Sequence, residues 1–267
     1  MLKFGDKGDE VIALQRLMNV FGFNLVVDGI YGVKTEEAVK MLQKCTGLVV
    51  DGAVGVKSDA ALHKKDIAKY LKENDIEEAA QLLSVDIATV KAVNKVESNG
   101  SGFLSDGRPK ILYERHIFYR EYSAENKGKN ELVLKWAQKR PDICSKSRGG
   151  YRGGAAEWGR YASAEAINPV CAKKSTSWGL FQILGCNFKS AGFGTVDEFV
   201  DAMRITERQH LLAFVHFIMA DKKMWDALKK QDWATFACRY NGPEYKRNNY
   251  DDKLKNAYRQ FAEMAPV

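Results

Sequence analysis

The sequence predicts an all-α protein of two domains, mainly helical, with one short β element. Three observations lead to this prediction. Apolar residues recur at helical spacing, few stretches alternate with the period of two that strands require, and a repeated unit lies in the first sixty or so residues. With 267 residues, 45% of them hydrophobic, the chain is long enough for two modest domains that each bury a core.

The repeat becomes visible when residues 25–39 are laid over residues 48–62, at an offset of 23 positions. Nine of the fifteen paired residues are identical, well above chance for so short a window. Each copy has an Asp-Gly turn, a second glycine and then Thr35 or Ser58, which we expect at a helix N-cap. An upstream apolar stripe at helical spacing consists of Val11, Leu14, Leu17 and Phe21. The pattern predicts a compact three-helix module over residues 1–64.

A charged segment with little apolar periodicity, residues 65–75, is expected to link this module to a second domain over residues 76–267. Apolar spacing in the second domain predicts helices over 76–83, 86–97, 131–139, 155–167, 195–220, 232–240 and 250–263. A short β element is expected around Gly102 to Leu112. The second domain is therefore predicted to be mainly α.

The formal charge of +7 and the pI near 9.0 favour a polyanionic partner, through attraction that salt would weaken. No zinc-finger spacing or RNA-binding aromatic signature accompanies the charge, so nucleic acid is not the expected partner. The apolar runs are too short for a bilayer, and the first residues lack the pattern of a signal peptide. We therefore expect neither membrane insertion nor a secretory signal.

Metal and thiol chemistry are not expected from the sequence. The four histidines are scattered without an HExxH motif, so no metal and no cofactor is predicted. The five cysteines are scattered without a CxxC pair, and we interpret them as reduced, mostly buried thiols.

Glu97 is the first candidate for chemistry. Ile87, Val90 and Val93 form one helical stripe, and Glu97 follows Val93 by four residues, so its side chain is expected to face inward. Gly100 is expected to end the helix, which places Glu97 beside the negative carbonyl end. Both effects raise a carboxyl pKa, as general-acid cleavage of a glycosidic bond requires. The alternative from this segment alone is a surface Glu at a frayed helix end.

Three motifs then occur in a fixed order, and further motifs accompany them. They are Glu-Ser-Asn-Gly at 97–100, Ser-Trp-Gly-Leu-Phe-Gln-Ile at 177–183 and Arg-Tyr-Asn-Gly-Pro at 239–243. This order resembles the goose-type lysozyme and lytic transglycosylase superfamily. The segments 111–118, 151–158 and 175–185 make the chain more similar to the phage endolysin N-acetylmuramidase family, over about residues 80–265. The resemblance implies a lysozyme-like helical domain that hydrolyses the β-1,4 bond between N-acetylmuramic acid and N-acetylglucosamine.

By this resemblance Glu97 is the catalytic acid. The residues expected to bind substrate are Ser177, Gln182, Tyr240, Asn241 and Tyr151. Trp178 and Phe181 are interpreted either as apolar faces for sugar rings or as core. Glu114 is our first choice for the second carboxylate and Asp106 the alternative, although an ion pair of Glu114 with Arg115 or His116 would explain Glu114 without catalysis.

The N-terminal repeat resembles the peptidoglycan-binding domain of cell-wall hydrolases, whose loop has the pattern DGxxGxxT. This resemblance places the ligand groove on the loop that contains Asp28, Tyr31 and Thr35. It implies a monomer that binds peptidoglycan, remains in the host bacterial cytoplasm until a holin releases it, and then acts in the periplasm and cell wall. A lytic transglycosylase, a non-catalytic wall-binding structural protein, and a prophage or autolysin origin remain alternatives.

Overall fold

The computed structural model describes residues 1–98, 100–127 and 130–263. The N-terminal helices are α1 (Asp9–Val20), α2 (Val33–Cys45) and α3 (Val56–Leu62). The other α-helices are α4 (Glu73–Leu83), α5 (Ile87–Glu97), α6 (Arg115–Glu125), α7 (Asn130–Lys139), α8 (Ala156–Glu165), α9 (Pro169–Lys174), α10 (Val196–Met203), α11 (Glu207–Ala220), α12 (Lys222–Lys229), α13 (Trp233–Asn241) and α14 (Tyr250–Glu263). The strands are β1 (Ile111–Tyr113), β2 (Thr176–Trp178) and β3 (Ile183–Leu184), and the 3-10 helices are η1 (Gly185–Asn187) and η2 (Pro243–Asn248).

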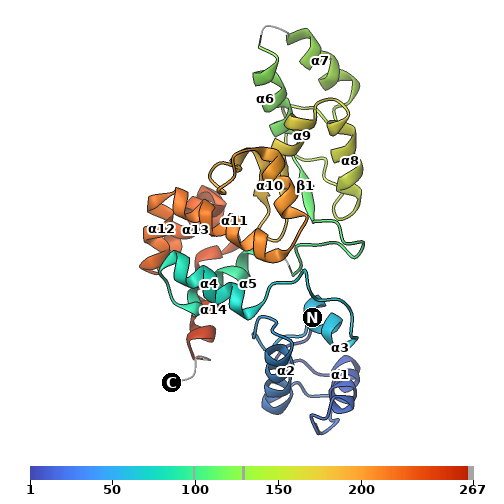
Figure 1. Cartoon of the computed structure of the whole chain (residues 1–267), viewed down its shortest axis with the longest axis vertical. Helices are drawn as coiled ribbons and strands as arrows, with labels where there is room; N and C mark the ends of the chain where they lie inside the picture. The colour runs from blue at the N-terminus through green and yellow to red at the C-terminus, as the bar shows by residue number, and fades with distance from the viewer. Residues whose placement is uncertain (99, 128–129, 264–267) are drawn as a thin grey trace.

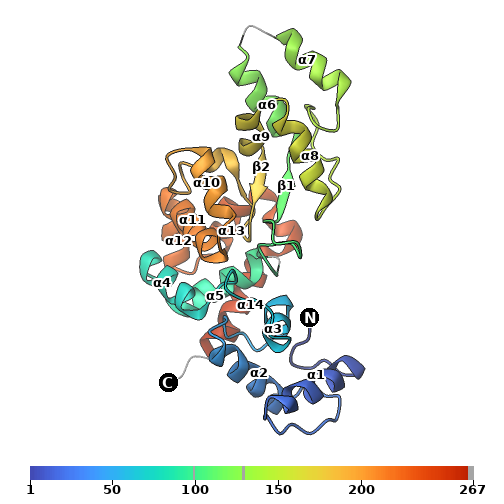
Figure 2. The same cartoon turned by 45° about the vertical axis from the view of Figure 1, so that its right-hand side comes forward.

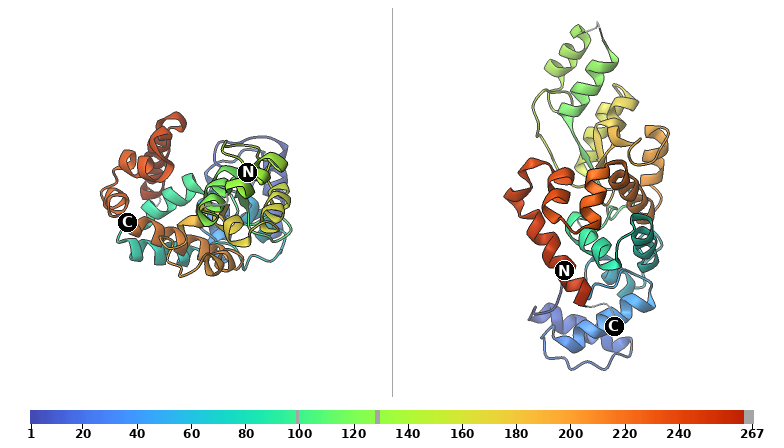
Figure 3. Two further views of the ribbon diagram at one scale, coloured as in Figure 1. Left: turned by 90° about the horizontal axis from the view of Figure 1, so that it is seen from above. Right: turned by 90° about the vertical axis from the view of Figure 1, so that its left-hand side faces the viewer.

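The molecule is elongated, with α1 to α3 at one end and α6 and α7 at the other (Figures 1 and 2). Between them lies a helical body formed by α4, α5 and α10 to α14. The last helix, α14, packs along α5 and extends toward the N-terminal helices (Figure 3). The predicted mainly α-helical fold is confirmed. No helix of the described ranges is long and apolar enough to cross a membrane.

The N-terminal module has the three expected helices, but the predicted capping residues are wrong. Gly32 and Gly55 are the N-caps of α2 and α3, so these helices begin two residues before Thr35 and Ser58. Both hydroxyl residues are buried in the first turn. Their hydroxyl groups instead donate to loop carbonyls, Thr35 to Ile30 at 3.4 Å and Ser58 to Ala53 at 3.1 Å. The repeat therefore uses its hydroxyl residues to close the loop, not to cap the helix.

The segment expected as a linker packs partly against the second domain. Leu71 is fully buried in the main core, and α4 already begins at Glu73, three residues before the predicted start. The helix expected over 195–220 is two helices, because the Thr206 side chain caps α11 by accepting from the Gln209 N–H. Helices α6, α9 and α12 were not predicted, and α9 and α12 are short, with six and eight residues.

The end of α5 also differs from expectation. The helix ends at Glu97, and Ser98 is already extended, whereas Gly100 has a left-handed φ of +79°. Gly100 is therefore not the residue that ends the helix. The correction leaves Glu97 in the last turn of α5, as predicted.

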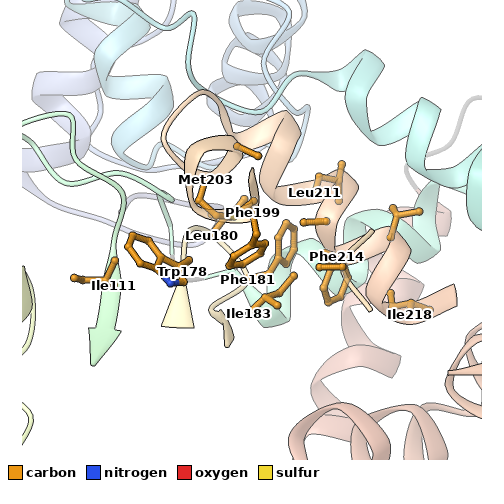
Figure 4. Close-up of a cluster of buried hydrophobic side chains, with 14 of the residues drawn as sticks. Ile111, Trp178, Leu180, Phe181, Ile183, Phe199, Met203, Leu211, Phe214 and Ile218 are labelled. Carbon is orange, nitrogen blue, oxygen red and sulfur yellow. The ribbon is translucent and has the colours of Figure 1, made fainter. Parts of the chain in front are cut away.

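The expected β element is the edge of a three-stranded antiparallel sheet in the order β1-β2-β3. Ile111 faces Trp178 in the register of β1 with β2. The largest core extends from α4 and α5 through the sheet to α10–α14, and Figure 4 shows the part of it around the sheet, α10 and α11. The turn after β2 needs a glycine, because Gly179 has a φ of +73° and a Cβ there would approach the His210 ring to 2.8 Å.

Candidate active site

Glu97 is half-buried at the end of α5, where the buried Val90 and Val93 fix the helix against the core. The Asn241 side-chain amide, at the end of α13, donates to Glu97 Oε1 at 2.9 Å. Burial raises the pKa of Glu97 to about 7, against the opposing effects of the Asn241 hydrogen bond and the Lys253 charge. The carboxyl group therefore holds its proton up to near-neutral pH, which is the state a general acid needs.

Tyr240 joins α13 to the turn that follows β2. Its hydroxyl group donates to the Phe181 carbonyl oxygen at 2.9 Å. Burial raises the pKa of Tyr240 well above 10, and the charge of Glu97 raises it further. The effect of Glu97 shows that the two side chains are electrostatic neighbours. Tyr240 therefore remains a neutral phenol beside the acid.

Gln182 lies at the same turn and is exposed, with a left-handed φ of +51°. Its amide nitrogen donates to the Gly179 carbonyl at 2.7 Å and, more weakly, to the Lys110 carbonyl at 3.4 Å. Lys110 directly precedes β1. The structure thus brings together the ends of α5 and α13, the turn after β2 and the start of β1.

Ser177, Trp178 and Phe181 have different surroundings. Ser177 is half-buried in the middle of β2, opposite Leu112 of β1. Trp178 is 1% exposed and meets the Tyr161 ring edge-on, with centroids 5.3 Å apart. Phe181 is 3% exposed and stacks on Phe214 with centroids 4.4 Å apart (Figure 4). Of the two interpretations of Trp178 and Phe181, the structure supports core packing.

Glu114 follows β1 at the end away from Lys110. It accepts a hydrogen bond from the Tyr151 hydroxyl at 2.8 Å, and His116 Nδ1 lies 3.2 Å from its Oε2. Burial lowers the pKa of His116 despite the opposing charge of Glu114. The anticipated pairing with Arg115 is wrong, because the Arg115 guanidinium donates to three loop carbonyls, those of Pro141, Ser147 and Arg148. Glu114 is therefore held by the Tyr151 hydroxyl, with the His116 ring beside it.

Neither expected second carboxylate is shown next to Glu97. Glu114 follows Lys110 by four positions, which corresponds to about 13 Å of extended chain. Asp106 is exposed in the turn between Phe103 and Pro109 and pairs with the Arg108 guanidinium at 2.6 Å, which lowers the pKa of Asp106. Within the described part of the chain, no carboxylate is among the groups that shift the pKa of Glu97.

The two loops of the N-terminal repeat are built around buried glutamines. Gln15 donates to Asp28 Oδ1 at 2.8 Å and accepts from the Gly29 N–H at 2.9 Å. Gln43 makes the corresponding contacts in the second copy, with Asp51 at 2.7 Å and Gly52 at 2.9 Å. The duplicated Asp-Gly sequence is therefore explained by an internal hydrogen-bond network that each copy repeats.

This network changes the interpretation of the expected wall-binding residues. Tyr31 is fully buried and its hydroxyl group donates to the Gly52 carbonyl at 2.9 Å, so its predicted place in a ligand groove is wrong. Thr35 is 3% exposed and equally internal. Asp28 is exposed and belongs to the loop network. Of the three residues, Asp28 alone presents its side chain to solvent.

The two loop copies also differ in exposure. In the first copy Val26 is 69% and Ile30 is 45% exposed. In the second copy Val49 packs against the core of the second domain, and the Val50 N–H donates to Glu73 Oε2 at 2.9 Å. One copy is thus a free surface, and the other is the contact between the two domains.

The histidines and cysteines are the remaining side chains with possible metal or thiol chemistry. No cluster of three or more His, Cys, Asp or Glu side chains that could hold a metal ion occurs among residues 1–98, 100–127 and 130–263. All five cysteines are free. Cys144 and Cys171 are buried, Cys186 and Cys238 are half-buried and Cys45 is exposed, so the prediction of mostly buried thiols is wrong.

The helical body with its small sheet carries a half-buried glutamate at a helix end, with a pKa raised by burial to about 7, beside an amide and a phenol. The family model described as N-acetylmuramidase matches residues 86–262, and the chain belongs to this family. A putative peptidoglycan binding domain matches residues 7–58. The two matches together give the chain the modular architecture of an endolysin.

A solved structure supports the same architecture over the whole chain. The chain is similar to the crystal structure of the Burkholderia AP3 phage endolysin, with 46% sequence identity and a TM-score of 0.91. The similarity covers 98% of this chain and 99% of the other. No curated protein sequence matches the chain. The match to a whole two-domain protein means that both domains and their order are shared.

Sequence reasoning missed several groups around these sites. Lys253 and Tyr250 of α14 interact electrostatically with Glu97, but no motif identifies them. Glu157 lies within the 151–158 segment on which the family resemblance is based, but the sequence did not predict a role for it. It is fully buried and accepts hydrogen bonds from the Tyr113, Arg152 and Gly153 N–H groups. The presence of a glutamate in that motif was the sequence feature that could have identified this buried carboxylate.

Proposed function

We propose that the protein binds bacterial peptidoglycan and hydrolyses the β-1,4 bond between N-acetylmuramic acid and N-acetylglucosamine, with Glu97 as the general acid. The observation that carries this proposal is the Glu97 pKa of about 7, caused by burial at the end of α5. A carboxylic acid with this pKa can protonate the glycosidic oxygen at neutral pH. Asn241 orients the acid through its hydrogen bond to Oε1.

Substrate contacts are proposed for the neighbouring polar groups. Gln182 is exposed at the turn beside Lys110, and its amide suits the N-acetyl and hydroxyl groups of a sugar. Tyr240 and Asn241 would line the bond being cleaved, and Ser177 would contact the chain from β2. Tyr151 and Glu114 would bind a more distant sugar, because Glu114 lies at the other end of β1 from the Gln182 contact.

The exposed copy of the repeat loop is proposed as the wall-binding surface. Val26, Ile30 and the exposed face of Asp28 lie together on this loop, whereas the second copy is covered by the catalytic domain. Amphipathic surfaces of this kind suit a glycan with peptide stems. Tyr31 and Thr35 would support the loop from inside.

For the biological role we propose lysis of a bacterial host. The similar Burkholderia protein is a phage endolysin, and this chain combines the same two domains. In this proposal the enzyme accumulates in the host cytoplasm, a holin opens the inner membrane, and the enzyme then reaches the cell wall as a monomer.

The test compares the parent enzyme with Glu97→Gln on purified sacculi. The Gln variant keeps the shape of the side chain and the oxygen that accepts from Asn241, but it has no proton to give. We expect loss of turnover by a factor of about 10³ or more, with pelleting on sacculi unchanged. Glu131→Gln, an exposed glutamate in the first turn of α7, is the matched control and should keep parental activity. Parental turnover in Glu97→Gln would refute the assignment.

One observation favours a second candidate, a lytic transglycosylase. No carboxylate of the described residues acts on the pKa of Glu97, and a transglycosylase needs only the acid, because the muramoyl C6 hydroxyl replaces water. Mass spectrometry of the digested sacculi separates the two reactions. Hydrolysis gives reducing muramic ends, whereas the alternative gives anhydro-muramoyl ends.

A further inference from the structure

A buried carboxylate at the start of α11 connects the two domains. Glu207 is fully buried, and Lys57 of α3 approaches its Oε2 to 2.6 Å. The same oxygen accepts from the Leu71 N–H at 2.8 Å, and Oε1 accepts from the Gly102 N–H at 2.7 Å. Lys57 forms a direct ion pair with Glu207, and the charge of Lys110 also interacts with this carboxylate. The N-terminal domain therefore supplies the cation that pairs directly with this buried charge of the catalytic domain.

From Glu207 the hydrogen bonds continue to the cleft. The Gly102 carbonyl accepts from the Lys110 N–H at 2.8 Å, and the Lys110 carbonyl accepts from the Gly179 N–H at 2.8 Å. The Lys110 carbonyl oxygen also accepts a weak hydrogen bond from the Gln182 side-chain amide, at 3.4 Å. Gly102 has no room to move toward the core, because a Cβ there would lie 2.5 Å from His210 Nδ1. Glu207 thus fixes the segment on which the Gln182 turn rests.

The repeat supplies an internal comparison for Lys57. Lys34 occupies the corresponding position in the first copy, 23 residues earlier, and is exposed. It forms no ion pair with any described residue. The three-helix module therefore does not need a paired lysine at this position for its own fold. The paired lysine of the second copy serves the contact between the domains.

We propose that Lys57 is a positioning residue for the catalytic cleft, acting through Glu207 and the Gly102–Lys110 segment on Gln182. The N-terminal domain then has two roles: it anchors the enzyme to the wall, and it completes the support of the active site. Removing the Lys57 charge takes away the cation that pairs directly with the buried Glu207 and leaves only longer-range charges such as that of Lys110, so the segment that Glu207 holds should shift or loosen. This inference rests on the proposed function, since it assumes that Gln182 binds substrate.

The test measures turnover of soluble peptidoglycan fragments, which do not require anchoring, by the full chain with Lys57→Met. We expect kcat to fall by about tenfold or more, because displacements near 1 Å in a catalytic site have effects of this size. Pelleting on sacculi should stay at the parental level. Lys57→Arg keeps the charge and should restore most of kcat. Lys65→Met, at an exposed lysine, is the matched control.

Circular dichroism confirms that each variant is folded at the assay temperature. If Lys57→Met does not fold, kcat on soluble fragments is measured for Lys57→Gln instead. This variant keeps an N–H donor without the charge, and the same decrease in kcat is expected. A folded, uncharged variant with parental kcat on soluble fragments would overturn the proposal. This outcome differs from failure of the proposed function, which is recognised by an active Glu97→Gln enzyme.

Discussion

Two glutamates, one at the C-terminal end of a helix and one at the N-terminal end, are both shielded from solvent, but their pKa values are shifted in opposite directions. Glu97, in the last turn of α5, receives one hydrogen bond, from the neutral amide of Asn241, and its pKa is raised to about 7 by burial. Glu157, in the first turn of α8, is fully buried, yet its pKa is lowered. Burial by itself would raise the Glu157 pKa, but three backbone N–H groups and the Arg160 guanidinium outweigh it.

The difference shows that burial raises the pKa of a carboxyl group only where hydrogen-bond donors and nearby cations do not outweigh it. The N-terminal turn of a helix favours negative charge, and the C-terminal turn opposes it. Glu157 also has a cationic partner at 2.7 Å, whereas Lys253 acts on Glu97 only at longer range. One carboxylate is therefore a structural anion, and the other holds its proton up to near-neutral pH.

The largest expected effect on stability is at Glu157. Glu157→Gln places an NH2 group where an acceptor is needed and leaves the buried Arg160 without a counter-charge. We expect the free energy of unfolding to fall by about 3 to 5 kcal/mol. Urea unfolding checks this, with Glu131→Gln as the exposed first-turn control, expected within about 0.5 kcal/mol of the parent. A decrease in the free energy of unfolding for Glu157→Gln no larger than that for Glu131→Gln would contradict the assignment of Glu157 as a stabilising buried anion.

Glu97→Gln should have the opposite effect on stability. The folded pKa of Glu97 lies above its ordinary value, so its favourable contribution is fully present below about pH 4.5 and is lost as pH rises through about 7. Between pH 5 and pH 8 the Gln variant should gain about 2 kcal/mol relative to the parent. Thermal or urea unfolding at the two pH values measures this gain. An equal difference at both pH values would contradict the raised pKa.

Activity should decrease on the alkaline side as pH passes about 7, because Glu97 then loses its proton. Asn241→Leu removes the hydrogen bond that lowers this pKa. The alkaline limb of kcat/KM should therefore move up by about half a pH unit, even though the total rate falls. The midpoint of the limb, not its height, is the quantity to measure. A midpoint that moves down would show that Asn241 does not stabilise the carboxylate.

The smallest expected effect is at Lys253, an exposed residue of α14 whose charge lowers the Glu97 pKa. Lys253→Met should move the same limb up by about 0.2 unit at low salt. At high salt the shift should vanish, because screening already removes the interaction in the parent. A shift that persists in high salt would point to a contact rather than to a long-range charge.

Much of the fold followed from local pattern. The helix that ends at Glu97 was predicted because three apolar residues at helical spacing precede it, and this spacing is set within the segment itself. The repeat likewise predicted three helices at the start of the chain. Helix α12 and the division between α10 and α11 were missed, because short amphipathic turns and a single capping Thr206 give weak local signals.

The candidate site could be predicted only in part from the sequence motifs. Glu97, Tyr240, Asn241 and Gln182 were named from motifs, and the structure brings them together at the junction of four elements. Tyr31 was placed wrongly, since a DGxxGxxT pattern does not say which of its side chains face inward. Its burial depends on a contact with the second loop copy, 21 residues away in the sequence.

By itself the sequence determined the helical segments, the duplicated module and the residue types able to perform acid chemistry, since these depend on neighbours within a few turns of chain. Tertiary structure alone decided which carboxylates are charged. The partners of Glu97 and Glu207 come from distant segments, including Lys57 of the other domain for Glu207. Glu157 combines the distant Tyr113 N–H with partners within five residues of itself. Because a pKa reflects all donors, charges and solvent around a group, it follows only once the chain has folded.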